Sequence, residues 1–425
     1  MAIRIGSGAL HSSHADSDMT QAKLKVLYCT MHNPCGPTYG SQLRTFHIAS
    51  QLASFCEIGL ALFPFTSPTP EERVKLENAF TYLGEFKFVP KPKRNPIDYF
   101  RQEFDKNWLY THGQQIDSED RARFLTLLSQ YDYVWFLGIR IPNALGIYHW
   151  PRSVLDIDDI PSTFYSTQAK SSSSILGKAR ALRKYFQWTR RERVLEARFS
   201  RIAVCSGLDR GYLGGSERIS TIPNGFEAPA QSLPPVGGSS FEIGFIGTCE
   251  YQPNRQGLEW FLSNCWQQIR LLNPKATLKL VGKMTEQYSS QKDGVFGLGW
   301  VEDADVEMAG WRIMIVPLHV GGGTRIKIAE AFSRKIPLVS TSLGAFGYTV
   351  SSGKELLIAD EPEAFSTACA KLLGDADLAN TLAHTAFQRF EEEWSWNAIR
   401  PKIRQTIDAL HAESKMEANN LSADI

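Results

Sequence analysis

Short apolar segments alternate with amphipathic segments along most of the chain. Residues 23–29 form the first apolar segment, and a loop with two prolines and two glycines follows it. Residues 41–54 then carry their apolar side chains at helical spacing, and residues 57–65 form a second apolar segment. This order of strand, loop, helix and strand predicts a parallel α/β sheet.

The alternation is interrupted once and then starts again. Further strands are predicted at residues 131–137, 153–157, 201–205 and 219–223. Residues 228–240 are rich in proline, glycine and serine and have no periodicity, which is typical of a linker. Beyond them, strands are predicted at 241–246, 277–281, 311–317 and 337–340, and helices at 257–272 and 324–334. The fold class is therefore α/β, with two successive units.

These breaks divide the chain. We expect a flexible leader at residues 1–22, a first domain at 23–227, a linker at 228–240 and a second domain at 241–385. A C-terminal helix at 386–412 and a tail at 413–425 complete the chain. Ligands of open α/β sheets bind beyond the carboxyl ends of the strands, so two such domains would face each other across a cleft.

Composition removes several classes of protein. The chain has 425 residues, with 46 basic and 45 acidic side chains, and this balance argues against a dedicated nucleic-acid-binding protein. The seven cysteines form no CxxC pair, which argues against a zinc site or a disulfide framework. The leader lacks the apolar core of a secretory signal, and the longest apolar run, residues 58–65, is far below the ~18 residues of a spanning helix. We therefore expect a cytoplasmic protein.

The most informative segment is residues 315–339, in which a strand runs into three glycines and then into a helix that begins near Thr324. Glycines allow a close backbone approach, and the free N–H groups of a helix start bind phosphate. Arg325 and Lys327 add positive charge, and the Glu330 carboxylate is suited to ribose hydroxyls. The segment predicts a nucleoside-diphosphate site; the alternative is a tight turn with a solvated Lys327–Glu330 pair.

At these residues the chain resembles a known family. The segment PLHVGGGTRIKIAEAF is similar to the donor-binding motif of nucleotide-sugar glycosyltransferases of family 4, the glycosyl transferases of group 1. Their GT-B architecture has two Rossmann-like domains facing a central cleft. Other segments agree with the resemblance and occur in the expected order: PTYG with Arg44, SRIAVCSGLDRGYL, TIPNGFE, FIGTCEYQPNRQGLEWF and WSWNAIRPKI. It implies that 23–227 is the acceptor-side domain, that 241–385 binds the donor and that the helix at 386–412 returns to the first domain.

The resemblance also assigns roles to residues. The amides of Gly322, Gly323 and Thr324 would hold the donor diphosphate, and Glu330 the ribose. Gly40 would close on the donor from the first domain. The donor-binding residues that we expect are Gly40, Gly247, Arg255, Gly322, Gly323, Thr324, Arg325 and Glu330.

The sequence departs from the family pattern at several positions. Gly322 stands where a first glutamate is usual, and Thr248 stands where an arginine is common. Arg255, together with Arg325 or Lys327, is expected to supply the missing charge. Two further departures are Tyr39, which replaces one glycine of the usual pair, and Asp158, which replaces a histidine.

The implied chemistry is transfer with retention of configuration by a hexosyltransferase-like enzyme, without a cofactor or metal. Arg325 and Lys327 would stabilise the charge that develops on the leaving diphosphate. Asp158, or its neighbour Asp159, would orient the acceptor or the sugar; alternatively, one of them caps the helix that begins near Pro161. These considerations make Arg325, Lys327 and Asp158 the candidate catalytic residues.

A basic stretch indicates a further partner. Residues 178–201 (Lys178 to Arg201) contain nine basic and two acidic side chains, interleaved with apolar residues at helical spacing. Such a helix would lie on an anionic membrane surface at the inner face of the membrane and would suit a lipid-linked acceptor. The alternative is a solvated helix whose apolar stripe packs on its own domain. Residues 87–101 form a second basic segment, and nucleic acid is not expected.

Three functions remain open at this point. The first is sugar transfer from a nucleotide-sugar to a saccharide, a lipid-linked or a small-molecule acceptor. The second is epimerisation of a sugar nucleotide on the same fold. The third is a catalytically silent binding or scaffold protein, which Gly322 and Thr248 would allow.

Overall fold

The computed structural model describes residues 23–36, 40–92, 96–172, 174–229 and 241–423. The predicted leader, and the predicted linker from residue 230 on, lie outside these residues. The chain forms two compact units: Met1–Asp156 with Glu196–Ile202 and Ile403–Ile425, and Ile157–Leu195 with Ala203–Lys402. The second unit thus includes residues on both sides of the predicted linker.

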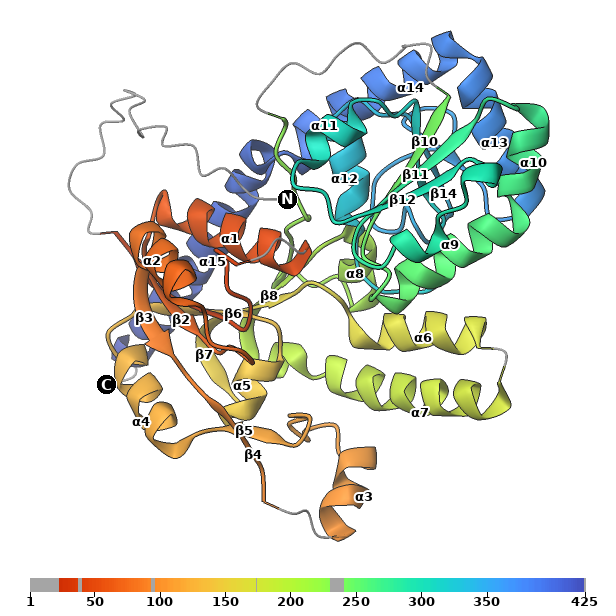
Figure 1. Cartoon of the computed structure of the whole chain (residues 1–425). Coiled ribbons are helices and arrows are strands. Elements are labelled where there is room, and N and C mark those ends of the chain that lie inside the picture. Colours follow the sequence, from red (N-terminus) through yellow and green to blue (C-terminus); the bar gives the residue numbers. More distant parts are fainter. Residues whose placement is uncertain (1–22, 37–39, 93–95, 173, 230–240, 424–425) are drawn as a thin grey trace, which may run out of the picture. The chain divides into compact units, whose positions relative to one another are not determined.

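The first unit is built on a parallel sheet (Figure 1). Strands β1, β2 and β6 are buried along almost their whole length, because the apolar runs of the sequence lie in the middle of the sheet. Helices connect the strands, and a capping box of Thr69 and Glu72 begins α2. The elements of this unit, in order, are β1 (Lys25–Thr30), α1 (Gly40–Ala53), β2 (Glu57–Leu62), α2 (Pro70–Ala79), β3 (Thr81–Glu85), β4 (Phe88–Pro90), α3 (Pro96–Phe104), β5 (Gln114–Ile116), α4 (Ser118–Leu128), β6 (Tyr133–Leu137) and α5 (Arg140–Ala144).

The division between the units crosses two strands of this sheet, β7 (Trp150–Ile157) and β8 (Phe199–Val204). The complete strand order is β3-β2-β1-β6-β7-β8-β9, with β9 at Ile219–Thr221. β4 and β5 form a separate antiparallel pair, and α3 follows β4. The helices between the last strands are α6 (Pro161–Ser171), α7 (Ile175–Glu192) and α8 (Gly207–Tyr212).

The second unit contains a six-stranded sheet in the order β12-β11-β10-β13-β14-β15, with parallel neighbours throughout. Its core joins Phe245 and Leu280 of the sheet to Phe261 and Phe365 of the covering helices. The strands are β10 (Glu242–Ile246), β11 (Thr277–Val281), β12 (Val295–Gly299), β13 (Ile313–Val316), β14 (Leu338–Ser340) and β15 (Leu357–Ile358). The helices are α9 (Gln252–Asn264), α10 (Trp266–Leu272), α11 (Ala304–Met308), α12 (Ile326–Ser333), α13 (Pro362–Gly374), α14 (Ala376–Arg389) and α15 (Trp396–Ala423).

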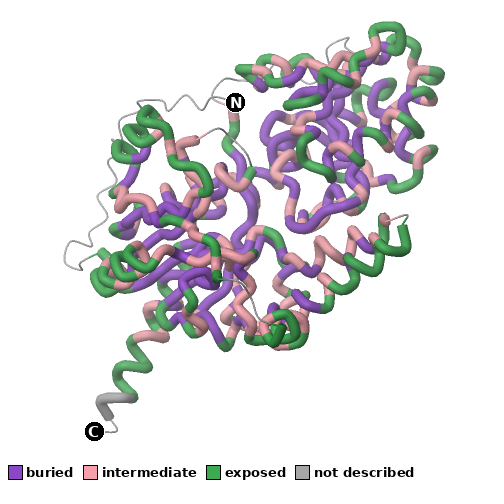
Figure 2. Tube along the Cα trace, turned by 60° about the horizontal axis from the view of Figure 1, so that its bottom comes forward, coloured by how far each residue is buried: buried purple, intermediate pink, exposed green. Residues whose placement is uncertain are grey.

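Both sheets have the strand order of a Rossmann fold, in which the first strand and the fourth are neighbours. In the second sheet the order reverses between β10 and β13, so the loops that follow these two strands mark its ligand-binding edge. The predicted α/β class is confirmed, and burial is concentrated in the strands (Figure 2).

Three local predictions differ from the structure. The helix predicted at 257–272 is two helices, α9 and α10, which meet at the buried Cys265. The helix predicted from Thr324 begins at Ile326, because Arg325 has an extended backbone and is the N-cap. Helix α15 extends to Ala423 and therefore includes most of the predicted tail.

Candidate anion site after strand β13

The glycine loop lies where the topology places a ligand, between the end of β13 and the start of α12. Gly321 and Gly323 have positive φ values of 138° and 64°. A Cβ atom on Gly323 would lie 1.8 Å from Oδ1 of Asp159 and 2.8 Å from the carbonyl oxygen of Asp158. Glycine is therefore required at position 323 both by its backbone conformation and by its neighbours.

Helix α6 packs directly on this loop. The Thr167 hydroxyl donates to the carbonyl of Gly321 and accepts from its amide, at 3.1 Å in both cases. A Cβ atom on Gly322 would lie 3.3 Å from Thr163 Oγ1 and from Phe164 Cβ. The family's usual glutamate at position 322 would therefore meet α6, and this contact accounts locally for the glycine.

Arg325 is folded back over the loop instead of extending from the first turn of the helix. Its Nη1 donates to the carbonyl of Gly322, and the residue is 9% exposed. Its Nε and Nη2 atoms are buried and have no hydrogen-bond partner among the described residues. A buried guanidinium with unpaired donors is costly unless an anion completes its hydrogen bonds.

Lys327 points from α12 toward the end of β10. Its Nζ donates to Asn254 Oδ1 at 2.9 Å and lies 4.8 Å from the centre of the Phe245 ring. A Cβ atom on Gly247 would lie 3.0 Å from the same Nζ. Burial, followed by the nearby Arg325, lowers the pKa of Lys327 to about 7. Lys327 thus places a cation beside the β10 loop, where the sequence has no arginine.

Glu330 is buried on the same helix and is held by Arg334. Arg334 Nη1 lies 3.6 Å from Glu330 Oε1, while Arg334 Nε donates to Asp305 Oδ1 at 2.8 Å. The guanidinium also lies 4.9 Å from the centre of the Phe226 ring. Burial raises the pKa of Glu330, and Arg334 and Lys327 oppose this rise. The solvated Lys327–Glu330 pair that we considered from the sequence does not form, because Lys327 and Glu330 have other partners.

Asp158 is tied to the loop by Asn224. The Asn224 amide donates to Asp158 Oδ1 at 2.7 Å and to Thr324 Oγ1 at 2.9 Å. Cys205 Sγ is a further donor to Asp158 Oδ1, at 3.2 Å. Asp158 is therefore a positioning group with satisfied partners in this structure.

Asp159 is the carboxylate that lies against Gly323. Asp159 remains accessible to solvent at its surface. Desolvation of its carboxyl group by the surrounding protein, followed by the charge of Asp158, raises its pKa to about 7. Arg325 lowers this pKa and Asp209 raises it further. Neither aspartate caps α6, since the N-cap position is Ile160 and the Ser162 amide donates to Glu192 instead.

Three further residues lie near the ends of strands or helices, and their surroundings are as follows. The Arg255 guanidinium is directed to the Cys249 carbonyl, at 3.5 Å. His319 packs on Trp260, with 4.3 Å between the ring centres. Gly40 begins α1 in the first unit. Its role toward a donor stays a prediction.

Arg44, which would by default be exposed, is fully buried in the first unit. Its Nη2 lies 2.7 Å from Asp156 Oδ1, and Trp135 Nε1 donates to Asp156 Oδ2 at 3.2 Å. Asp156 is therefore part of the core of the first unit.

Sequence reasoning missed the residues that support the loop: Thr167, Asn224 and Asn254. Asn224 and Asn254 lie in segments that we had assigned to the family, TIPNGFE and FIGTCEYQPNRQGLEWF, so their positions were visible but their partners were not. Thr167 lies 154 residues before Gly321, and no local pattern connects the two.

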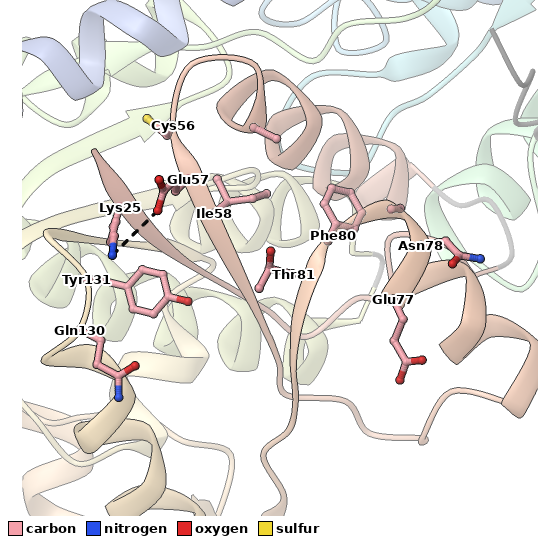
Figure 3. Close-up of a pocket in the computed structure, with 12 residues that line it drawn as sticks. Lys25, Cys56, Glu57, Ile58, Glu77, Asn78, Phe80, Thr81, Gln130 and Tyr131 are labelled. Atoms are coloured by element: carbon pink, nitrogen blue, oxygen red, sulfur yellow. Dashed lines mark ion pairs between the residues drawn. The ribbon is translucent and has the colours of Figure 1, made fainter. Parts of the chain in front are cut away.

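A separate depression lies in the first unit, at the amino ends of the strands of its sheet (Figure 3). It has a volume of about 730 Å³, and the starts of β1, β2 and β3 contribute Lys25, Glu57 and Thr81 to its wall. Lys25 and Glu57 form an exposed ion pair at 3.9 Å. Because ligands of α/β sheets bind at the carboxyl ends of the strands, this depression is distinct from the anion site.

No cluster of three or more metal-binding side chains occurs among the described residues. Within the same part of the chain, every helix is too short or too polar to cross a bilayer.

Two parallel sheets with this strand order, together with a glycine loop that carries two cations, define the class to which the fold belongs: the GT-B fold. Residues 240–375 match the family model of glycosyl transferases group 1, and this range lies within the second unit. The resemblance predicted from the sequence is confirmed.

Solved structures and a curated relative are similar to this chain. Anabaena Alr3699/HepE, solved with UDP and glucose, has a TM-score of 0.61 at 16% identity, covering 91% of this chain and 100% of its own. Sucrose-phosphate synthase from Thermosynechococcus elongatus has a TM-score of 0.62 at 15% identity, covering 92% and 100%. A 44.6 kDa protein of the Klebsiella pneumoniae cps region is 21% identical over 309 residues, covering 68% of this chain and 77% of that protein.

Proposed function

We propose that this glycosyltransferase takes its sugar from a nucleoside-diphosphate donor bound at the loop between β13 and α12. The observation that carries the proposal is Arg325, whose Nε and Nη2 are buried beside Gly321, a residue of positive φ, without a partner in the described part of the chain. A diphosphate would complete these hydrogen bonds, and the amides of the loop would add further donors.

Different residues of the site would bind the donor and stabilise the leaving diphosphate. Arg325 and Lys327 would face the charge that develops on the departing diphosphate, which is the main electrostatic need of glycosyl transfer. Two cations supplied by the chain support a mechanism that does not require a metal. Glu330, held in place by Arg334, would accept hydrogen bonds from the ribose.

Transfer with retention is the stereochemical course that we propose. In that course the leaving phosphate takes the acceptor proton, so a strong protein base is not required. Asp158, fixed by Asn224, would position the donor sugar or the acceptor. Asp159 would be the carboxyl group nearest to the bound diphosphate, because it lies against Gly323.

For the acceptor we propose a saccharide, which can be lipid-linked. HepE was solved with UDP and glucose, and we extend to this chain the expectation of a UDP-hexose donor. The reaction would take place in the cytoplasm, where nucleotide sugars are made, with a peripheral position at the inner face of the membrane when the acceptor is a lipid.

The test is donor binding and turnover with a panel of UDP-, GDP- and ADP-sugars. A bound donor raises the melting temperature, and a positive donor is then assayed for transfer to saccharide acceptors. Arg325→Ala should abolish the thermal shift. Retention of the full shift and full turnover in this variant would contradict the assignment of the site.

Glu330 offers a sharper test of the ribose contact. We expect Glu330→Ala to raise the donor Kd by about 10- to 100-fold, since a hydrogen bond to a charged group contributes ~1.5–3 kcal/mol. Glu330→Gln keeps the shape and one acceptor, so its loss should be smaller. Equal affinity of all three proteins for the donor would rule out the ribose role.

Epimerisation and silent binding predict different outcomes of the same experiment. An epimerase converts the donor without an acceptor and leaves its mass unchanged, whereas a glycosyltransferase releases a nucleoside diphosphate. A silent binding protein shows the thermal shift but no product. Chromatography of the nucleotide pool, which resolves epimers of equal mass, followed by mass spectrometry separates the three functions.

A further inference from the structure

Helix α7 buries only one of its faces. Ala181, Trp188 and Glu192 are buried, and α7 packs against α6, which runs beside it (Figure 1). The backbone amide of Ser162, in the first turn of α6, donates to Glu192 at 2.9 Å. The orientation of α7 within the second unit is therefore fixed, and its other face is directed to solvent.

The outward face is apolar along its centre. Ile175, Ala179, Leu182 and Phe186 follow one another at spacings of four, three and four, so they form a single stripe along the helix. The exposed fractions of Ile175, Leu182 and Phe186 are 90%, 38% and 56%. The stripe that we considered as a packing surface is thus uncovered, and the exposed turns of the helix can be followed in Figure 2.

Basic side chains flank this stripe on both sides. At 100° per residue, Lys178 lies roughly 70° from the stripe on one side, and Arg183 and Arg190 lie roughly 50–70° from it on the other. The whole helix carries six basic residues and one acidic residue. An apolar stripe with basic side chains on either side of it is the pattern of a helix that lies in the plane of a membrane interface.

Helix α3 provides an informative contrast. It also exposes apolar side chains, Ile97, Phe100 and Phe104, with exposed fractions between 57% and 67%. However, its Arg101 is accompanied by two acidic residues, Asp98 and Glu103, so the helix has no net positive charge. Of the two helices, α7 alone combines an apolar stripe with charge complementary to an anionic surface.

We infer that the outward face of α7 docks onto an anionic lipid bilayer. Phe186, Leu182 and Ile175 enter the headgroup boundary, and Lys178, Arg183 and Arg190 contact lipid phosphates. The inference deepens the peripheral position proposed for this enzyme. It does not depend on the identity of the donor, because the stripe is separate from the residues of the anion site.

The test is co-sedimentation of the full-length protein with vesicles of phosphatidylcholine, with and without phosphatidylglycerol. Binding should require phosphatidylglycerol and should weaken as salt is added. Leu182→Ser with Phe186→Ser should reduce the partition coefficient about tenfold. Arg183→Glu with Arg190→Glu should reduce the partition coefficient on the order of a hundredfold, since the two substitutions lower the net charge by four units.

Matched variants control for general effects. Leu271→Ser with Leu272→Ser alters exposed leucines on α10, and Lys292→Glu with Lys354→Glu reverses two exposed lysines. Both controls should bind vesicles like the unmodified protein. Thermal shift with UDP in the absence of vesicles checks that every variant is folded and reports the anion site independently.

Equal vesicle binding by the α7 variants and the controls would overturn the inference. It would also be overturned if the unmodified protein does not bind anionic vesicles. A dimer that the Leu182 and Phe186 substitutions abolish would then show that the stripe is a contact between two copies of the chain. Loss of UDP binding with intact vesicle binding would reject the donor site alone.

Discussion

At the scale of residues, the charged groups of the candidate site differ in whether their hydrogen bonds and ion pairs are complete. Arg334 and Glu330 pair with each other, and Asp158 is satisfied by Asn224 and Cys205. Arg325, in contrast, has two buried nitrogen atoms that no described residue satisfies. A cluster in which one cation lacks hydrogen-bond partners is suited to bind an anion. The missing partners of Arg325 could not be inferred from the order of the residues in the sequence.

Two groups of the site predict a pH dependence of donor binding. The pKa values of Lys327 and Asp159 are both about 7. As the pH rises through 7, Lys327 loses a positive charge and Asp159 gains a negative one, and both changes disfavour a bound diphosphate. Affinity for UDP-glucose should therefore fall between about pH 6 and about pH 8, by about tenfold for each group.

The measurement is calorimetry with UDP-glucose, whose diphosphate does not titrate in this range. Lys327→Met should remove one part of the slope, and Asp159→Asn the other. The charged neighbours that act on these groups are Arg325 and Glu330 at Lys327, and Asp158, Asp209 and Arg325 at Asp159. An affinity that is constant or rises with pH would contradict the assignment.

At the scale of elements, the loop depends on two helices that are distant in the sequence. Helix α12 and its N-cap residue contribute Lys327, Glu330 and Arg325, and α6 contacts Gly321 through Thr167. The site is therefore a property of the strand end and both helices together, and a change in the loop should be felt at each of them.

Gly323→Ala tests this arrangement. The substitution strains a residue with φ of 64° and places a methyl group against Asp159, so the donor-induced thermal shift should disappear and the melting temperature should fall. Gly353→Ala is a matched control, because Gly353 has φ of 85° but an added methyl group would meet no described atom within 4 Å. The control should lose only about 1–2 kcal/mol of stability and should bind donor normally. Equal effects of the two substitutions would show that backbone strain alone matters.

At the scale of the whole molecule, a buried ion pair and the candidate anion site lie in different units. The first unit contains a buried ion pair between Arg44 and Asp156, and the candidate anion site lies in the second unit. A change in the pair should therefore alter the stability of the fold without removing a donor contact in the second unit.

Arg44→Ala leaves the Asp156 carboxylate buried without its cation, which should cost about 3–5 kcal/mol. Urea unfolding followed by tryptophan fluorescence measures this cost, and Trp135, which donates to Asp156, is one of the ten tryptophans that contribute to the signal. Arg73→Ala is the control: Arg73 is about half exposed in its pair with Glu85, so its loss should cost ~1 kcal/mol or less. A small effect of Arg44→Ala would mean that the pair contributes little.

The sequence by itself determined the α/β fold class, the main strands of both sheets and the glycine loop. Apolar runs that are buried on both faces of a sheet, and glycines at the end of a strand, have periods and spacings that can be read from one chain, so the α/β fold and the loop at residues 321–323 were predicted. The family resemblance rested on the same local segments.

The tertiary structure decided which side chains meet. Thr167, Asn224 and Asn254 reach the site from segments up to 154 residues away, and the partners of Lys327 and Glu330 depend on how α12 packs. The burial of Arg44 and the exposure of the α7 stripe were decided in the same way. Hydrogen bonds and desolvation act between atoms that are close in space, and proximity across distant segments is set by packing, which no local pattern of residues records.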